Sequence, residues 1–68
     1  MSEKAFKKIT VVGCSTASIE KAVQAAIAKA GETIHGLSWF EVTELRGSIP
    51  KAGELEWQAT VEIGFRID

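Results

Sequence analysis

The chain has 68 residues, a formal net charge of −1 at pH 7, one cysteine and one histidine. So short a chain forms at most one domain, and we expect residues 1–68 to be a single domain. One cysteine excludes an internal disulfide, and one cysteine with one histidine excludes a Cys/His metal cluster, so no metal site is expected. A domain of this size buries only about 60% of its unfolded surface. Without disulfides or a metal it usually needs association with other subunits.

Charge and hydropathy also restrict the partners and the location of the protein. Acidic and basic residues are mixed along the chain, without the basic footprint of a nucleic-acid binder. No apolar run approaches the ~20 residues that span a membrane. No apolar segment of a signal peptide follows the first lysines. With the lone cysteine, these features predict a cytoplasmic protein that binds neither nucleic acid nor a membrane.

The first half of the chain predicts a strand followed by a helix. β-branched residues favour a strand over residues 6–13. A helix is expected from about Thr16 to Ala30, where apolar residues recur at helical spacing, and Gly31 is a suitable stop. The residues of this apolar stripe are Ile19, Val23, Ile27 and Ala30.

Two long strands complete the chain, over residues 33–49 and 55–67, with a turn at 51–54. Every second residue of the last strand is apolar and faces one way: Leu55, Trp57, Ala59, Val61, Ile63, Phe65 and Ile67. The sequence therefore predicts an α+β fold in the order β-α-β-β, with a three-stranded antiparallel sheet wrapped on one helix. The hairpin strands reach roughly 45 Å at ~3.3 Å per residue. Since the helix is only about 22 Å long, much of the sheet needs cover from another subunit.

The alternation of the strand over 33–49 breaks after Val42. Phe40 and Val42 share one face, whereas Leu45 has the opposite parity. A β-bulge near Thr43 and Glu44 would place all three apolar side chains on one face.

Trp39 is the most informative residue of this strand. If Phe40 and Val42 join the core under the helix, Trp39 points to the opposite, outer face of the sheet, as do Gln58 and Thr60 of the last strand. One interpretation is that Trp39 packs against another subunit. The other is a stacking platform for a planar ligand, with the Gln58 amide hydrogen-bonded to the ligand's edge.

The stretch W-F-E-V-x-E-x-R-G at 39–47, the glutamine of the last strand and the ending G-F-R resemble the dodecin family. The resemblance covers about residues 4–67, including the opening KKITVVGCS and the alanine-rich helix. Dodecins are small flavin-binding proteins that assemble into hollow homododecamers. The resemblance implies that Trp39 stacks on the isoalloxazine ring of FMN or riboflavin, in a site shared with a symmetry-related tryptophan. It implies that Gln58 hydrogen-bonds the flavin edge.

The same resemblance implies storage or sequestration of flavin, with quenching of its photochemistry, and no enzymatic activity. Lys4 and Arg66 are candidates to bind a phosphate, either of FMN or of another nucleotide such as coenzyme A, because cationic side chains suit phosphate. No Ser/His/Asp set, metal-ligand spacing or glycine-rich phosphate loop is present, so no catalytic residue is predicted. A flavin-dependent oxidoreductase subunit and a purely structural oligomer without a ligand are the alternatives.

Four further residues are interpreted without a ligand role. Arg46 is expected in a surface or interface ion-pair network, and His35 at the surface or an interface. Cys14 is interpreted as a packing residue. Trp57 has the parity of the covered face, and we expect it in the core or in a subunit interface.

Overall fold

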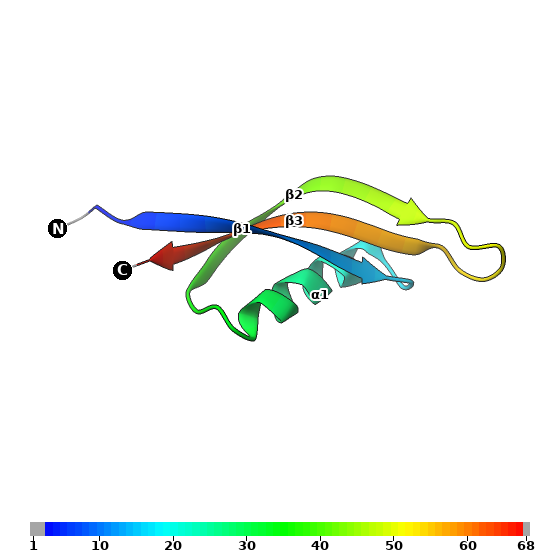
Figure 1. The fold of residues 1–68 in the computed structure, drawn as a ribbon, viewed down its shortest axis with the longest axis horizontal. Helices are drawn as coiled ribbons and strands as arrows, with labels where there is room; N and C mark the ends of the chain where they lie inside the picture. The colour runs from blue at the N-terminus through cyan, green and yellow to red at the C-terminus, as the bar shows by residue number, and fades with distance from the viewer. Residues whose placement is uncertain (1–2, 68) are drawn as a thin grey trace.

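The computed structural model describes residues 3–67 and has the expected β-α-β-β order. Its elements are β1 (Ala5–Ser15), α1 (Ile19–Gly31), β2 (Leu37–Ser48) and β3 (Glu56–Ile67). The sheet order is β1-β3-β2, and β3 is antiparallel to both neighbours. The helix lies on one face of this sheet (Figure 1). We call that face of the sheet inner and the opposite face outer. The predicted three-stranded antiparallel sheet with one helix is confirmed.

The sheet is much longer than the helix that covers it. The domain measures 56 × 21 × 14 Å, whereas the 13 residues of α1 span about 20 Å. Strands continue past both ends of the helix (Figure 1). Among residues 3–67 there is no helix long and apolar enough to cross a membrane.

The helix begins at Ile19, three residues later than the expected start at Thr16. Ser18 has an extended backbone, with φ −168°, and its hydroxyl accepts a hydrogen bond of 3.0 Å from the Lys21 N–H. This is an N-cap, which satisfies one N–H of the first turn. Several Ser and Thr hydroxyls precede the helix, and the sequence pattern did not distinguish which of them caps it.

The face of α1 that contacts the sheet is formed by Ala22, Ala26 and Ala30, all buried. The predicted stripe was therefore wrong for Ile19, which is 38% exposed. It was right for Ala30, and for Val23 and Ile27, which are partly buried and pack against the core. Small side chains on this face let the helix backbone lie close to β1.

Gly13 of β1 makes this close approach possible. A Cβ at Gly13 would lie 2.8 Å from the Ala26 nitrogen and nearer still to the Ala22 carbonyl oxygen. Opposite the helix alanines, Ala59, Val61 and Ile63 of β3 are almost fully buried. The alternation predicted for the last strand is confirmed at these three core positions.

β2 begins at Leu37, four residues later than expected, because the preceding residues form a turn and a loop. Gly36 has φ +77°, a left-handed conformation that glycine adopts readily. Its carbonyl oxygen accepts a hydrogen bond of 3.0 Å from the Arg66 N–H. His35 is therefore exposed in the loop before β2 instead of lying in the strand.

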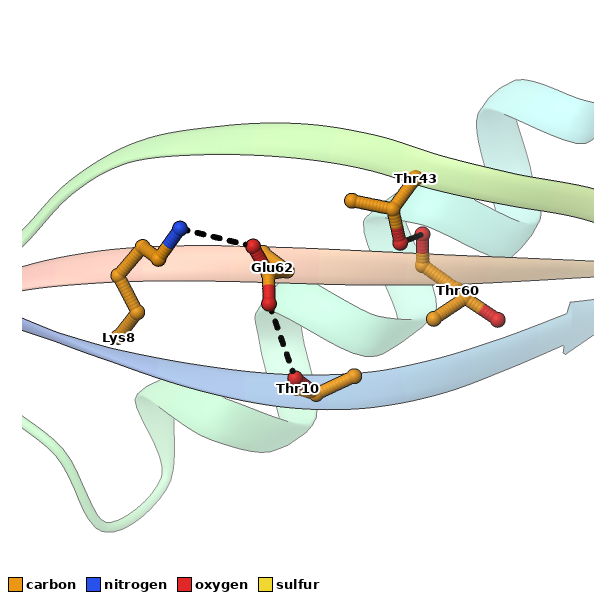
Figure 2. A network of polar contacts seen from close by, with 5 residues as sticks. All are labelled: Lys8, Thr10, Thr43, Thr60 and Glu62. Atoms are coloured by element: carbon orange, nitrogen blue, oxygen red, sulfur yellow. Dashed lines mark hydrogen bonds and ion pairs between the residues drawn. The ribbon is translucent and has the colours of Figure 1, made fainter.

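The predicted bulge is present, because the pairing of β2 with β3 shifts between Val42 and Glu44. The Thr43 hydroxyl lies 3.4 Å from the Thr60 carbonyl oxygen, to which it donates a hydrogen bond. Figure 2 shows this contact on the outer side of the sheet. The bulge changes the parity of β2, so that Leu45 pairs with the buried Ala59 while Arg46 pairs with Gln58 on the outer face.

The helix packs against β1 and β3 and leaves the inner face of β2 beyond Leu37 without cover. Phe40 is 53% exposed, Val42 42% and Leu45 48%. Phe40 and Val42 were expected in a core under the helix. They have the expected orientation, but α1 lies too far toward β1 to cover them. One chain thus exposes an apolar stripe, which is typical of a surface that associates.

Candidate functional site

The outer face of the sheet carries the aromatic residue singled out from the sequence. Trp39 pairs with Gly64 of β3, and Gly64 pairs with Lys8 of β1. The indole lies across β3, with its ring atoms directly over the Gly64 backbone. Trp39 remains 42% exposed. One face of the indole thus rests on the sheet, and the opposite face is open to a partner.

Lys8 and Glu62 form an ion pair on this face of the sheet, as Figure 2 shows. The Lys8 Nζ lies 2.9 Å from Glu62 Oε1 and 5.9 Å from the centroid of the Trp39 ring. The Thr10 hydroxyl donates a 3.4 Å hydrogen bond to Glu62 Oε2. The hydrogen bond from Lys8 and its charge lower the pKa of Glu62, and the same contact raises the pKa of Lys8.

These shifts predict a pH dependence of stability. The pKa of Glu62 is lower in the folded protein, so its contribution is present above the ordinary carboxyl pKa of about 4.5 and is lost as the pH falls through the lowered value. Replacing Glu62 by Gln should therefore lower the free energy of unfolding at neutral pH, and the difference from the wild-type protein should become smaller as the pH falls. Chemical unfolding of both proteins over this pH range measures the difference.

The loss of free energy of unfolding caused by Glu62→Gln should be small and should decrease in high salt, because the Lys8–Glu62 pair is exposed to solvent. A difference between the two proteins that stays constant from neutral to acid pH would contradict the contribution of the ion pair.

Gln58 lies on the same face with its amide held at both ends. Arg46 Nε donates to Gln58 Oε1 at 2.9 Å, and Gln58 Nε2 donates to Glu56 Oε1 at 3.0 Å. These contacts fix the orientation of the amide. They leave one of its N–H groups and one oxygen lone pair for a further partner. Arg46 thus contacts the candidate ligand residue itself, beyond the surface network expected for it.

Trp39 and Gln58 do not meet within one chain. Trp39 pairs with Gly64, which is six positions from Gln58 along β3 (64 − 58 = 6). Six residues of a strand span roughly 20 Å. The alternation of the sequence correctly predicted the shared face but did not fix the position along it. A ligand that contacts both side chains must take them from two copies of the chain.

Lys4 and Arg66, the candidate phosphate-binding residues, line one shallow depression at the chain ends. Glu3, Ala5 and Ile67 also line it. Arg66 lies two positions beyond Gly64 in β3, which is roughly 7 Å along the strand. The structure therefore brings these two residues together, near the end of the sheet where Trp39 lies.

Other expectations are resolved by burial. Trp57 is partly buried and packs against the core, as predicted. Cys14 is an exposed thiol on the outer face opposite Gln58, so its interpretation as a packing residue was wrong within one chain.

The sequence reasoning did not find Lys8, Glu62 or Gly64 beside Trp39. A glycine inside a strand signals a close approach, and this signal was available for Gly64.

The fold and the site together define a small α+β protein with a flat aromatic platform on an open sheet face. A family model described as Dodecin matches residues 5–68. The chain is 48% identical over 65 residues to a dodecin of Thermus thermophilus, covering 96% of this chain and 94% of that protein.

Solved structures of similar proteins have the same fold. A crystal structure of a T. thermophilus protein matches with a TM-score of 0.90 at 47% identity, covering 97% of each chain. A dodecin from Streptomyces coelicolor matches with a TM-score of 0.91 at 37% identity, covering 100% of this chain and 97% of the other. The chain belongs to the dodecin family, which confirms the resemblance found in its sequence.

Proposed function

We propose that this protein binds FMN or riboflavin between Trp39 residues of two copies and stores it without turning over a substrate. The observation that carries the proposal is the indole of Trp39, which lies flat on the sheet and is 42% exposed. An indole open on one face stacks well on a planar aromatic ring. Two such faces from two copies would enclose a flavin ring or a pair of rings.

The amide of Gln58 supports this ligand class. With one N–H and one oxygen lone pair left over, it both donates and accepts. The polar edge of a flavin ring carries carbonyl acceptors and an N–H donor, which match those two groups. Because one chain holds Gln58 roughly 20 Å from Trp39, the amide at a given platform must come from another copy.

The depression lined by Lys4 and Arg66 supports FMN as one of the two flavins. The depression lies near the end of the sheet that carries Trp39, and its two cationic side chains suit the phosphate of FMN. Coenzyme A is the alternative phosphate ligand of the same depression.

Assembly is part of the proposal. The apolar stripe on the inner face of β2 needs cover, and the site on the outer face needs residues from more than one chain. Family membership favours a hollow homododecamer. We expect the protein to function in the cytoplasm.

The flavin would supply a light-absorbing ring that is reactive in its excited state. Stacked Trp39 would donate an electron to that excited ring and take it back, so that no net oxidation remains. The two indoles would also exclude a second substrate from the ring faces. Storage without catalysis follows from these two roles of Trp39.

Fluorescence titration tests the proposal. Adding the flavin-free protein to riboflavin should quench the flavin emission to a low plateau, and size exclusion should give the mass of an oligomer. Bright emission at saturating protein would contradict flavin storage at this platform. Steady oxidation of NAD(P)H by the flavin-loaded protein would instead identify an oxidoreductase subunit.

A further inference from the structure

Gly64 occupies a place where the backbone does not require glycine. It lies inside the central strand β3, and among the described residues only Gly36 and Gly53 have positive φ. Glycine weakens a strand interior, since it adds conformational freedom and no side chain to pack. A glycine with ordinary strand geometry is therefore most useful where another group approaches the backbone closely.

The group that approaches is the indole of Trp39. A Cβ at Gly64 would lie 2.7 Å from Cδ2 of that ring, and closer still to Cε2 and Cζ2. These three atoms belong to the six-membered ring and to its junction with the five-membered ring. Gly64 is buried while Trp39 is 42% exposed, so the indole covers the glycine as a lid lying flat on the strand.

We propose that Gly64 is a positioning residue for the flavin platform: its missing side chain lets the Trp39 indole lie flat on the sheet with one face outward. This inference rests on the proposed function. A methyl group at position 64 would lift or tilt the ring, so that two indoles in facing copies would no longer be parallel. The Lys8 Nζ, which is paired with Glu62, lies 5.9 Å from the centroid of the Trp39 ring. Lys8 therefore limits how far a displaced ring can move toward β1.

A purely structural role is the competing explanation, because an aromatic side chain packed over a glycine also stabilises a sheet. The two roles differ in what a substitution changes. A structural role would lower stability and leave the affinity and quenching of the assembled protein unchanged. A positioning role changes both of these in protein that is still assembled.

The experiment compares Gly64→Ala, Trp39→Phe and the double variant by riboflavin titration, after size exclusion has shown assembly. Gly64→Ala should weaken riboflavin binding by at least ~10-fold and leave the bound flavin less quenched. In the Trp39→Phe background, Gly64→Ala should cost less, because a phenyl ring has no atom at the position of the indole Cζ2, one of the three atoms nearest to that Cβ. Thr60→Ala, on the same face of the same strand, serves as the control and should leave the affinity unchanged.

An unchanged dissociation constant for Gly64→Ala, alongside lost binding in Trp39→Ala, would overturn the inference and leave the proposed function standing. An equal cost of Gly64→Ala in both backgrounds would also overturn it. If Gly64→Ala does not assemble, recovery of assembly in the double variant supports the close approach, and failure to recover contradicts it. A wild-type protein that does not quench riboflavin would contradict the proposed function itself.

Discussion

Replacing Trp39 by alanine is expected to remove most of the flavin binding and nearly all of the quenching. Stacking on an aromatic side chain contributes roughly 1–3 kcal/mol per base in nucleic-acid complexes, and a symmetric site loses two such platforms at once. The dissociation constant for riboflavin should therefore rise by at least ~30-fold. Fluorescence titration measures the change in affinity, and the emission at saturating protein measures the residual quenching.

The second tryptophan provides the control for this experiment. Trp57 is partly buried against the core, so Trp57→Phe should alter stability slightly and leave flavin affinity within about twofold. If both variants lose binding equally, the loss reflects general damage to the assembly. Retention of full quenching by Trp39→Ala would remove the basis for a flavin platform on this face.

Replacing Gly13 by alanine is expected to cause the largest loss of stability. The added methyl group would collide with helix backbone at Ala22 and Ala26, which cannot rotate away as a side chain could. Forced overpacking lowers the free energy of unfolding by about 1–3 kcal/mol or occasionally more. Because the methyl group meets backbone atoms, we expect a loss at the upper end of this range, about 3 kcal/mol. For so small a domain this lowers the midpoint of thermal unfolding by at least ~10 °C.

Gly31→Ala is the matched control for Gly13→Ala. A Cβ at Gly31 would meet only the Leu37 Cδ1 atom, at 3.6 Å, which is ordinary contact. This variant should change the free energy of unfolding by no more than about 0.5 kcal/mol. Equal losses in the two variants would show that the space between β1 and α1 is not the reason for Gly13.

The sequence predicted most of the fold, and its failures have a physical cause. The bulge after Val42 followed from the parity of three apolar residues, and the structure confirms it. The contact face of the helix was misjudged at Ile19, Ala22 and Ala26, because hydrophobicity ranks isoleucine above alanine. How closely the backbones of a helix and a strand approach each other depends instead on how small the side chains between them are. Gly13 precedes the helix by only six positions, but no periodic pattern pairs it with Ala22 and Ala26, so it did not reveal that approach.

The candidate site was predicted by face but not by position. Alternation in β3 places Gln58 on the outer face, and the parity of Phe40 in β2 places Trp39 there. The pairing register, however, decides which residues lie opposite one another. That register depends on the conformation of residues 49–55, which no periodic pattern specifies. The separation of Trp39 and Gln58 therefore became visible only in the structure, and with it the need for a second chain.

The bulge in β2 has a consequence for how copies of the chain avoid aggregation. β2 is an edge strand, since β3 pairs with it on one side and none of residues 3–67 pairs with it on the other. Open edges invite uncontrolled strand addition, and natural edges resist it with bulges and charged side chains. β2 has both, with Glu41, Glu44 and Arg46 beside the irregular pairing. Its edge thus opposes open-ended growth, while its side-chain faces remain available for a closed assembly.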